Sequence, residues 1–131
     1  MEFLHSEITN NILKAFYTVC NALPFGLETE TYKNALNIEL AELGLQTELN
    51  KKLSIEYKSK EVGSFIADIV VNKLVLIKII SQQHELEKSD EQLVKNQLLL
   101  SDIEVSLILN FGIEANHKRV FLSNDYKHRK N

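Results

Sequence analysis

Two short runs of mostly apolar residues constrain the fold of this chain most strongly. They are "LVLIKII" at residues 74–80 and "EVSLILNFG" at residues 104–112. Each run has the length of a buried strand and is short for a helix. A helical segment beginning near Ser89 separates them, and a strand–helix–strand unit of this kind favours two parallel neighbouring strands. Since such strands are apolar on both sides, we expect them inside a sheet that helices cover on both faces.

Apolar residues at helical spacing predict two further helices before these strands. The first covers about residues 5–22, and the second covers about residues 27–43 and ends at Gly44. The only proline of the chain and a glycine, in "LPFG", separate the two helices. The third helix is predicted to begin with a capping box, because Ser89 and Gln92 have the required spacing.

After Gly44 the apolar period changes from helical to alternating. Alternation predicts strands in "KLSIEYKS" (52–59) and "SFIADIVV" (64–71), and Asn72-Lys73 is a tight connection to the strand that follows. The segment "RVFLS" (119–123) predicts a short fifth strand. The predicted class is therefore α/β (α+β), with a mixed central β-sheet of about five strands flanked by helices.

Length and composition narrow the function classes. A chain of 131 residues with 44% hydrophobic and 25% charged residues is typical of one globular domain, here 1–131 with a short basic tail from about residue 124. The apolar runs are far shorter than a membrane span, and the first residues lack the features of a secretory signal. A single cysteine, Cys20, excludes a disulfide framework or a cysteine metal site. We therefore expect a cytoplasmic protein without membrane contact.

The charge distribution leaves nucleic-acid binding open. A net charge of −3 argues against overall electrostatic binding, but the residues from Ile113 onward contain five Lys or Arg and two acidic residues. A solvated surface and a frayed terminus also explain these charges. The candidate phosphate contacts are Lys58, Lys60, Lys118, Arg119, Lys127 and Arg129.

Lys78 is the exceptional residue of the apolar strands. An ammonium group does not enter an apolar strand cheaply, so Lys78 is expected to lose its proton or to have a partner. The identity of that partner decides whether Lys78 belongs to an active site.

The order of these segments resembles the GxxExxY protein family of the PD-(D/E)XK nuclease superfamily. The resemblance covers roughly residues 5–123 and implies a restriction-endonuclease-like fold, in agreement with the predicted elements. It rests on "LPFGLETETYKNALNIELAELGL", "VGSFIADIVVNKLVLIKI", "DEQLVKNQLLL", "VSLILNFG" and "KRVFLS".

The resemblance also implies a chemistry, the hydrolysis of phosphodiesters. A metal ion generates hydroxide and stabilises charge on the phosphate, and Mg²⁺ prefers carboxylate oxygens. The family has a glutamate on a helix, an aspartate on a strand and a Glu-x-Lys triplet on the next strand. Strand alternation points both charged members of the triplet to one face, where the lysine orients water or stabilises developing charge.

When the catalytic residues of the family are carried onto this chain, the part that belongs to the helix is incomplete. Gly26 and Tyr32 match the ends of the GxxExxY motif, but Thr29 stands where the family has glutamate. Glu28 and Glu30 flank Thr29 at about 100° round the helix. One of them could substitute after a small rotation of the helix, or both could face solvent near the positive end of the helix dipole.

The strand part of the set is also changed. Asp68 matches the family aspartate, while Lys78 stands in place of the glutamate of the triplet and Ile80 in place of its lysine. Gln92 matches a glutamine on the following helix. The resemblance therefore implies a remnant catalytic set of Asp68, Lys78 and Gln92.

Two interpretations of Lys78 are open. It is either an active-site lysine moved by one alternation step, or an ammonium in place of the missing cation and paired with Asp68. The second is favoured because an ammonium and one carboxylate neutralise each other and repel a metal ion. Under it no metal or other cofactor is expected, whereas Asp68 would be the ligand if any metal bound.

These observations predict a catalytically inactive nuclease-like protein that binds nucleic acid or another protein. The alternatives are an active Mg²⁺- or Mn²⁺-dependent nuclease with an unconventional site and a structural subunit that self-associates. Neither the partner nor the oligomeric state follows from the sequence.

Overall fold

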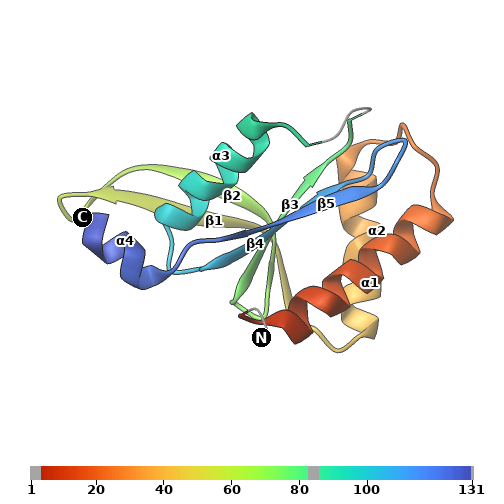
Figure 1. The fold of residues 1–131 in the computed structure, drawn as a ribbon, viewed down its shortest axis with the longest axis horizontal. Helices are drawn as coiled ribbons and strands as arrows, with labels where there is room; N and C mark the ends of the chain where they lie inside the picture. Colours follow the sequence, from red (N-terminus) through yellow and green to blue (C-terminus); the bar gives the residue numbers. More distant parts are fainter. Residues whose placement is uncertain (1–3, 83–85, 131) are drawn as a thin grey trace.

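The computed structural model describes residues 4–82 and 86–130, with side chains as far as Lys127. The elements follow the order of the two predicted helices, three strands, a helix and two strands, with one more helix at the end (Figure 1). The helices are α1 (Ser6–Ala22), α2 (Thr29–Glu42), α3 (Lys88–Leu99) and α4 (Asn124–Lys130). The strands are β1 (Thr47–Tyr57), β2 (Lys60–Val71), β3 (Val75–Ile80), β4 (Val105–Asn110) and β5 (Asn116–Phe121).

The five strands form one mixed sheet in the order β1-β2-β3-β4-β5. β3 and β4 are parallel, as the crossover through α3 predicted, and all other neighbouring strands are antiparallel. The predicted fold class is confirmed: the protein has a five-stranded mixed sheet with flanking helices.

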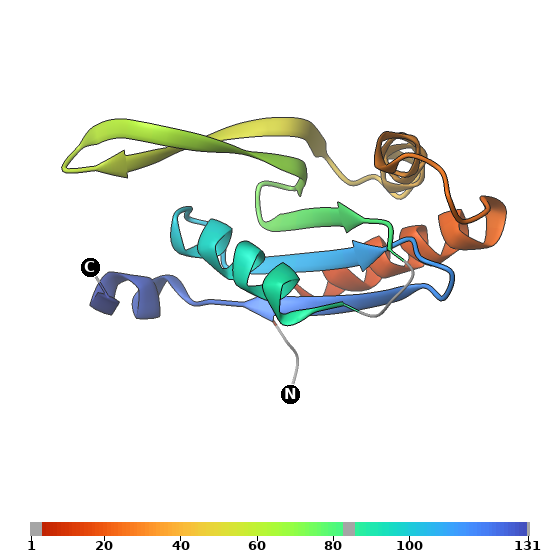
Figure 2. The same ribbon diagram turned by 90° about the horizontal axis from the view of Figure 1, so that it is seen from above.

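Helices cover both faces of the sheet, as Figures 1 and 2 show. α1 and α2 lie on one face, over a core that includes Phe16, Leu36 and Leu107. α3 lies on the other face, over a smaller core around Val94 and Ile108. All six residues of β4 are buried, which agrees with its apolar sequence.

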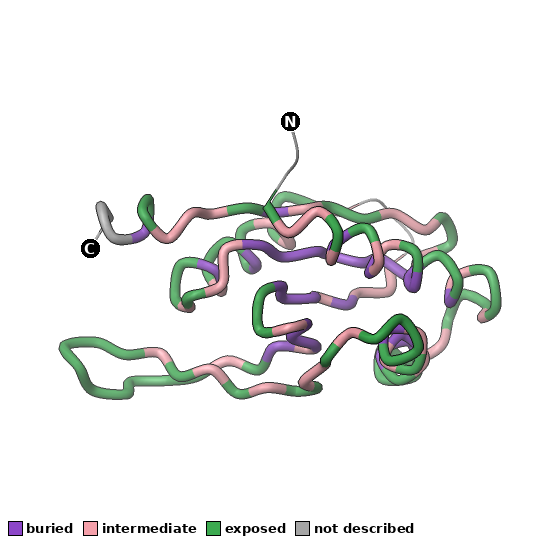
Figure 3. The backbone as a smooth tube through the Cα atoms, turned by 90° about the horizontal axis from the view of Figure 1, so that it is seen from below, coloured by how far each residue is buried: buried purple, intermediate pink, exposed green. Residues whose placement is uncertain are grey.

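The hairpin of β1 and β2 begins earlier on each strand than the sequence predicted. β1 starts at Thr47 rather than near residue 52, and β2 starts at Lys60 rather than near residue 64. Asn50 has a positive φ of 52°, and the pairing is irregular next to Ile55. From Lys51 to Glu56, β1 alternates between half-buried and exposed residues. Residues 60–64 of β2 are all exposed, so burial imposes no alternation on the start of that strand (Figure 3).

Two predictions about helices are also corrected. The capping box predicted at Ser89 is wrong, since α3 begins one residue earlier and the N–H of Glu87 donates to Asp90 Oδ2 at 3.0 Å. The segment from residue 124 forms α4 and is not a frayed tail. The predicted end of α2 is confirmed, because Gly44 follows it with a positive φ of 79°.

Candidate functional site

The pair of Asp68 and Lys78 lies where β2 and β3 separate. The paired residues of these strands end with Ile69 opposite Ile77, so Asp68 and Lys78 come directly after the last rung. The Asp68 Oδ2 atom accepts the backbone N–H of Ile79 at 2.8 Å and lies 3.9 Å from Lys78 Nζ. The carboxylate thus bridges the gap that opens between the two strands.

The partner of Lys78 is therefore Asp68, as the favoured interpretation of the sequence predicted. Both side chains are partly exposed, however, with relative accessibilities of 30% for Lys78 and 22% for Asp68. The expectation of a buried lysine is corrected: Lys78 reaches solvent, which lowers the cost of its charge. The backbone bond to Ile79 has no signal in the sequence, because it depends on where the strands part.

The other residues of the remnant set do not join this pair. Gln92 is exposed on α3, where its Nε2 donates to Asn96 Oδ1 at 3.0 Å. Ile80 packs into the apolar cluster beneath α3. Thr29 is exposed at the first turn of α2.

The flanking acids do not replace the missing glutamate either. Glu30 Oε2 forms an ion pair of 2.7 Å with Lys33 Nζ, a nearly buried lysine that also donates to Asn50 Oδ1. Glu28 is exposed as the N-cap residue of α2. The burial of Lys33 was not anticipated; only its place within the apolar period of α2 hints at it.

The two ends of the GxxExxY motif have a structural role. Gly26 adopts a φ of 101° in the turn between α1 and α2. The hydroxyl of buried Tyr32 donates to the carbonyl of Pro24 at 2.5 Å and accepts the N–H of Leu27 at 3.2 Å. The ring of Tyr32 stacks on Phe111 with centroids 4.6 Å apart. These contacts fix the turn to the core.

The donor set at Asp68 does not fit a magnesium ion. Mg²⁺ requires near-octahedral oxygen ligands at about 2.0–2.1 Å and is usually held by one or two carboxylates together with substrate phosphates. Here the facing group is an ammonium and Oδ2 already accepts an N–H. Across residues 4–82 and 86–127, no group of three or more His, Cys, Asp or Glu side chains could hold a metal ion.

Three of the candidate phosphate contacts are engaged within the protein. Lys118 Nζ lies 3.7 Å from Glu91 Oε1, and the guanidinium of Arg119 donates to the carbonyl of Leu4 at 2.9 Å. Lys127 is buried and donates to the carbonyls of Ser101 at 2.9 Å and Ile103 at 2.6 Å.

Lys127 is therefore a structural residue that ties α4 to the segment between α3 and β4, and its assignment as a phosphate contact is corrected. Burial lowers the pKa of Lys127, while Glu104 and Asp102 act in the opposite direction. The sequence placed Lys127 in a basic tail because it gave no sign of α4.

Of the three remaining candidates, two lie at the tip of the β1–β2 hairpin. Lys58 and Lys60 are exposed at the tip of the β1–β2 hairpin, where the Lys58 ammonium lies over the Tyr57 ring at 5.6 Å. The side chain of Arg129 lies outside the described residues. Exposed basic side chains also lie on the body of the protein, among them Lys95 on α3 and Lys118 on β5, so they are not confined to the hairpin.

The mixed sheet, its two helical layers and the polar pair between diverging strands define an α+β protein with a restriction-endonuclease-like fold. A family model described as the PD-(D/E)XK nuclease superfamily matches residues 6–120, and the chain belongs to this superfamily. Comparisons with curated proteins and with solved structures gave no match. No helix among the described residues has the length and apolar character needed to span a membrane.

Proposed function

We propose that this chain is a nuclease-fold protein that does not hydrolyse phosphodiesters and that acts by binding another macromolecule. The observation that carries the proposal is the Asp68–Lys78 pair, in which an ammonium faces the carboxylate at 3.9 Å. Within the superfamily we place the chain with the GxxExxY type, because Gly26 and Tyr32 match the ends of that motif while Thr29 replaces its glutamate.

A protein partner is favoured over nucleic acid. Lys118, Arg119 and Lys127 have intramolecular partners, and a phosphate would have to compete with them. Lys60 and Lys58 remain, but Glu56 and Glu61 lie beside them on the hairpin. A surface of mixed sign is a weak site for a polyanion.

Calorimetric titration of Mn²⁺ tests the loss of the metal site. We expect no binding that depends on Asp68, so the wild-type protein and Asp68→Ala should give the same result. Binding to the wild type that disappears in Asp68→Ala would restore the nuclease interpretation and overturn the proposal.

Lys78→Glu tests whether metal binding can be restored. It places a second carboxylate beside Asp68, so this variant should bind Mn²⁺ and melt at a higher temperature when Mn²⁺ is present. Lys78→Gln removes the ammonium without adding a ligand and should show a much smaller effect. If Lys78→Glu also fails to bind Mn²⁺, the ammonium of Lys78 is not what prevents metal binding.

Anisotropy of labelled DNA and RNA tests the preference for a protein partner. We expect no binding at physiological salt. Affinity that falls steeply with salt and is lost in Lys58→Glu would show that the hairpin binds nucleic acid instead.

A further inference from the structure

The outer edge of β1 is a surface with unsatisfied pairing capacity. β1 is the terminal strand of the sheet, and within the described part of the chain it pairs only with β2. From Lys51 to Tyr57 every residue is exposed or half-buried. An edge strand of this length presents a row of backbone N–H and C=O groups to any strand that approaches it.

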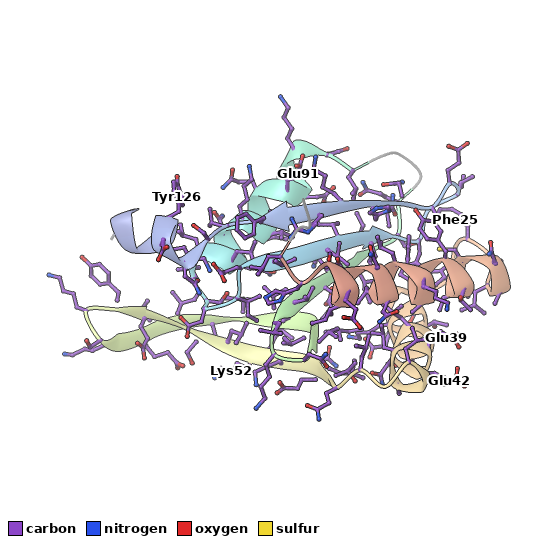
Figure 4. All side chains as sticks on the ribbon, turned by 60° about the horizontal axis from the view of Figure 1, so that its bottom comes forward. Phe25, Glu39, Glu42, Lys52, Glu91 and Tyr126 are labelled. Carbon is purple, nitrogen blue, oxygen red and sulfur yellow. The ribbon has the colours of Figure 1, made fainter. Side chains whose placement is uncertain are left out.

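α2 lies against the first part of β1 and leaves the second part open. The Thr47 hydroxyl donates to Asn37 Oδ1, and Lys33 Nζ donates to Asn50 Oδ1. Beyond Asn50, β1 pairs with a part of β2 that no longer pairs with β3. The hairpin extends outward from the other strands in Figure 2. Figure 4 shows Lys52 extending from β1 to the outside of the sheet. The open edge therefore begins at Lys51.

We propose that this edge pairs with the same edge of a second copy of the chain, antiparallel and about a two-fold axis at Ser54. A two-fold interface requires one surface to be complementary to itself. In this register Lys52 of each copy lies opposite Glu56 of the other, and Leu53 lies opposite Ile55. Lys52, Ser54 and Glu56 share one face of the strand, and Leu53 and Ile55 share the other.

Charge selects this register among its neighbours. An axis at Leu53 places Lys52 opposite Ser54, and its only opposite charges are Glu48 and Lys58 at the two ends of β1, where Glu48 is already paired with Lys51. An axis at Lys52 places two lysines opposite each other. An axis at Ile55 places Lys52 opposite Lys58. Like charges directly opposite each other destabilise strand pairing, whereas opposite charges stabilise it.

The shape of the molecule agrees with the register. With the axis at Ser54, Tyr57 of one copy lies opposite Lys51 of the other, and the hairpin tip ends beside Asn50. Axes nearer the start of β1 would drive the tip further along the strand, towards α2. The contact is short, so we expect a weak dimer with a dissociation constant on the order of micromolar to tens of micromolar.

This inference goes beyond the proposed function, and the two are tested separately. The Mn²⁺ titration addresses Asp68, whereas the experiments on the edge measure the molecular mass of the protein. A negative result for one proposal therefore does not affect the other proposal.

Sedimentation velocity with charge-reversed variants tests the interface. The wild type should pass from monomer to dimer between about 1 µM and about 200 µM, a range that brackets the affinity of small interfaces. Lys52→Glu and Glu56→Lys each create two like-charge pairs and should weaken the dimer at least about tenfold. Lys14→Glu makes the same charge change on an exposed position of α1 and should leave the dimer unchanged.

An equimolar mixture of Lys52→Glu and Glu56→Lys is the decisive sample. In the mixed dimer each acidic position faces a basic one, so the mixture should recover the mass that neither variant reaches alone. A wild type that stays monomeric, or a mixture no heavier than its components, would overturn the proposal. Circular dichroism of each variant separates misfolding from loss of the interface.

A cysteine at the axis gives an independent measurement. Residues directly opposite each other have Cβ atoms about 4.5–5.5 Å apart, so oxidised Ser54→Cys should form a covalent dimer. Ser64→Cys lies opposite on β2, one strand further inside, and should not. Burial raises the pKa of the Cys20 thiol to about 11, which keeps it largely protonated near neutral pH in both samples. Equal cross-linking of the two variants would exclude the register.

Discussion

The inner and outer halves of β2 differ in burial and in strand pairing. From Ile69 to Val71 the strand pairs with both β1 and β3 and every side chain is buried, whereas from Lys60 to Ile66 it pairs only with β1 and is exposed except at half-buried Phe65 (Figure 3). Asp68 lies between the two halves, one residue before the first pair with β3. One strand therefore has two structural roles: its inner half belongs to the core, and its outer half supports β1, the edge strand proposed above as an interaction surface.

Replacing one isoleucine by alanine in each half of β2 measures how much burial in that half contributes to the free energy of unfolding. Ile69 is fully buried, so Ile69→Ala should lower the free energy of unfolding by about 2–5 kcal/mol through lost burial and the cavity it leaves. Ile66 is 53% exposed, and Ile66→Ala should cost less than about 1 kcal/mol. Urea denaturation of the two variants measures both values.

The two substitutions remove the same atoms from the same strand, so each is the control for the other. If both variants lose the same free energy of unfolding, the outer half of β2 contributes as much to stability as the inner half. The division of β2 into core and protrusion would then be wrong.

Asp68→Ala probes the boundary between the halves. The N–H of Ile79 loses its acceptor and Lys78 loses its partner, so we expect a loss of about 1–2 kcal/mol in urea denaturation. Fully buried pairs cost more to break, but both side chains here reach water. Lys78→Met removes only the partly exposed ion pair and should cost less than about 1 kcal/mol.

The order of these two values separates the roles of the carboxylate. If Lys78→Met costs more than Asp68→Ala, the ion pair and not the backbone bond holds the strands at this point. The bridging role assigned to Asp68 would then be incorrect.

The sequence predicted the inner half of the molecule well for a physical reason. Burial imposes a period, so β3, β4 and the helices around them could be located from apolar residues alone. The Asp68–Lys78 pair was also predictable, because a lysine inside an apolar strand needs a partner and the adjacent strand contained one carboxylate at a matching position.

The outer parts of the molecule carried no comparable signal. The exposed residues of the hairpin need not alternate, so the start of β2 at Lys60 was missed. The burial of Lys127 depends on α4 docking against the carbonyls of Ser101 and Ile103, a contact distant in sequence. Gln92 was assigned from resemblance, and a helix face cannot be fixed by resemblance alone.

Two turns that each contain two consecutive residues with positive φ allow the smallest effect to be tested. Lys58 and Ser59 at the outer turn have φ values of 52° and 65°, and Asn72 and Lys73 at the inner turn have values of 50° and 59°. Glycine is favoured at such positions, because other residues are strained at positive φ. Lys73→Gly and Ser59→Gly are therefore matched substitutions.

Their effects should differ because the two turns belong to different halves of the molecule. Lys73→Gly relieves strain at a turn anchored by Asn72, which bonds to Gln46, and should raise the global free energy of unfolding by about 0.5–1 kcal/mol. Ser59→Gly should leave the global value within about 0.3 kcal/mol while slowing amide hydrogen exchange in the hairpin. An equal global gain from Ser59→Gly would show that the hairpin unfolds together with the core. The hairpin that carries the proposed interaction surface would then be a rigid extension of the sheet and not a separately stable arm.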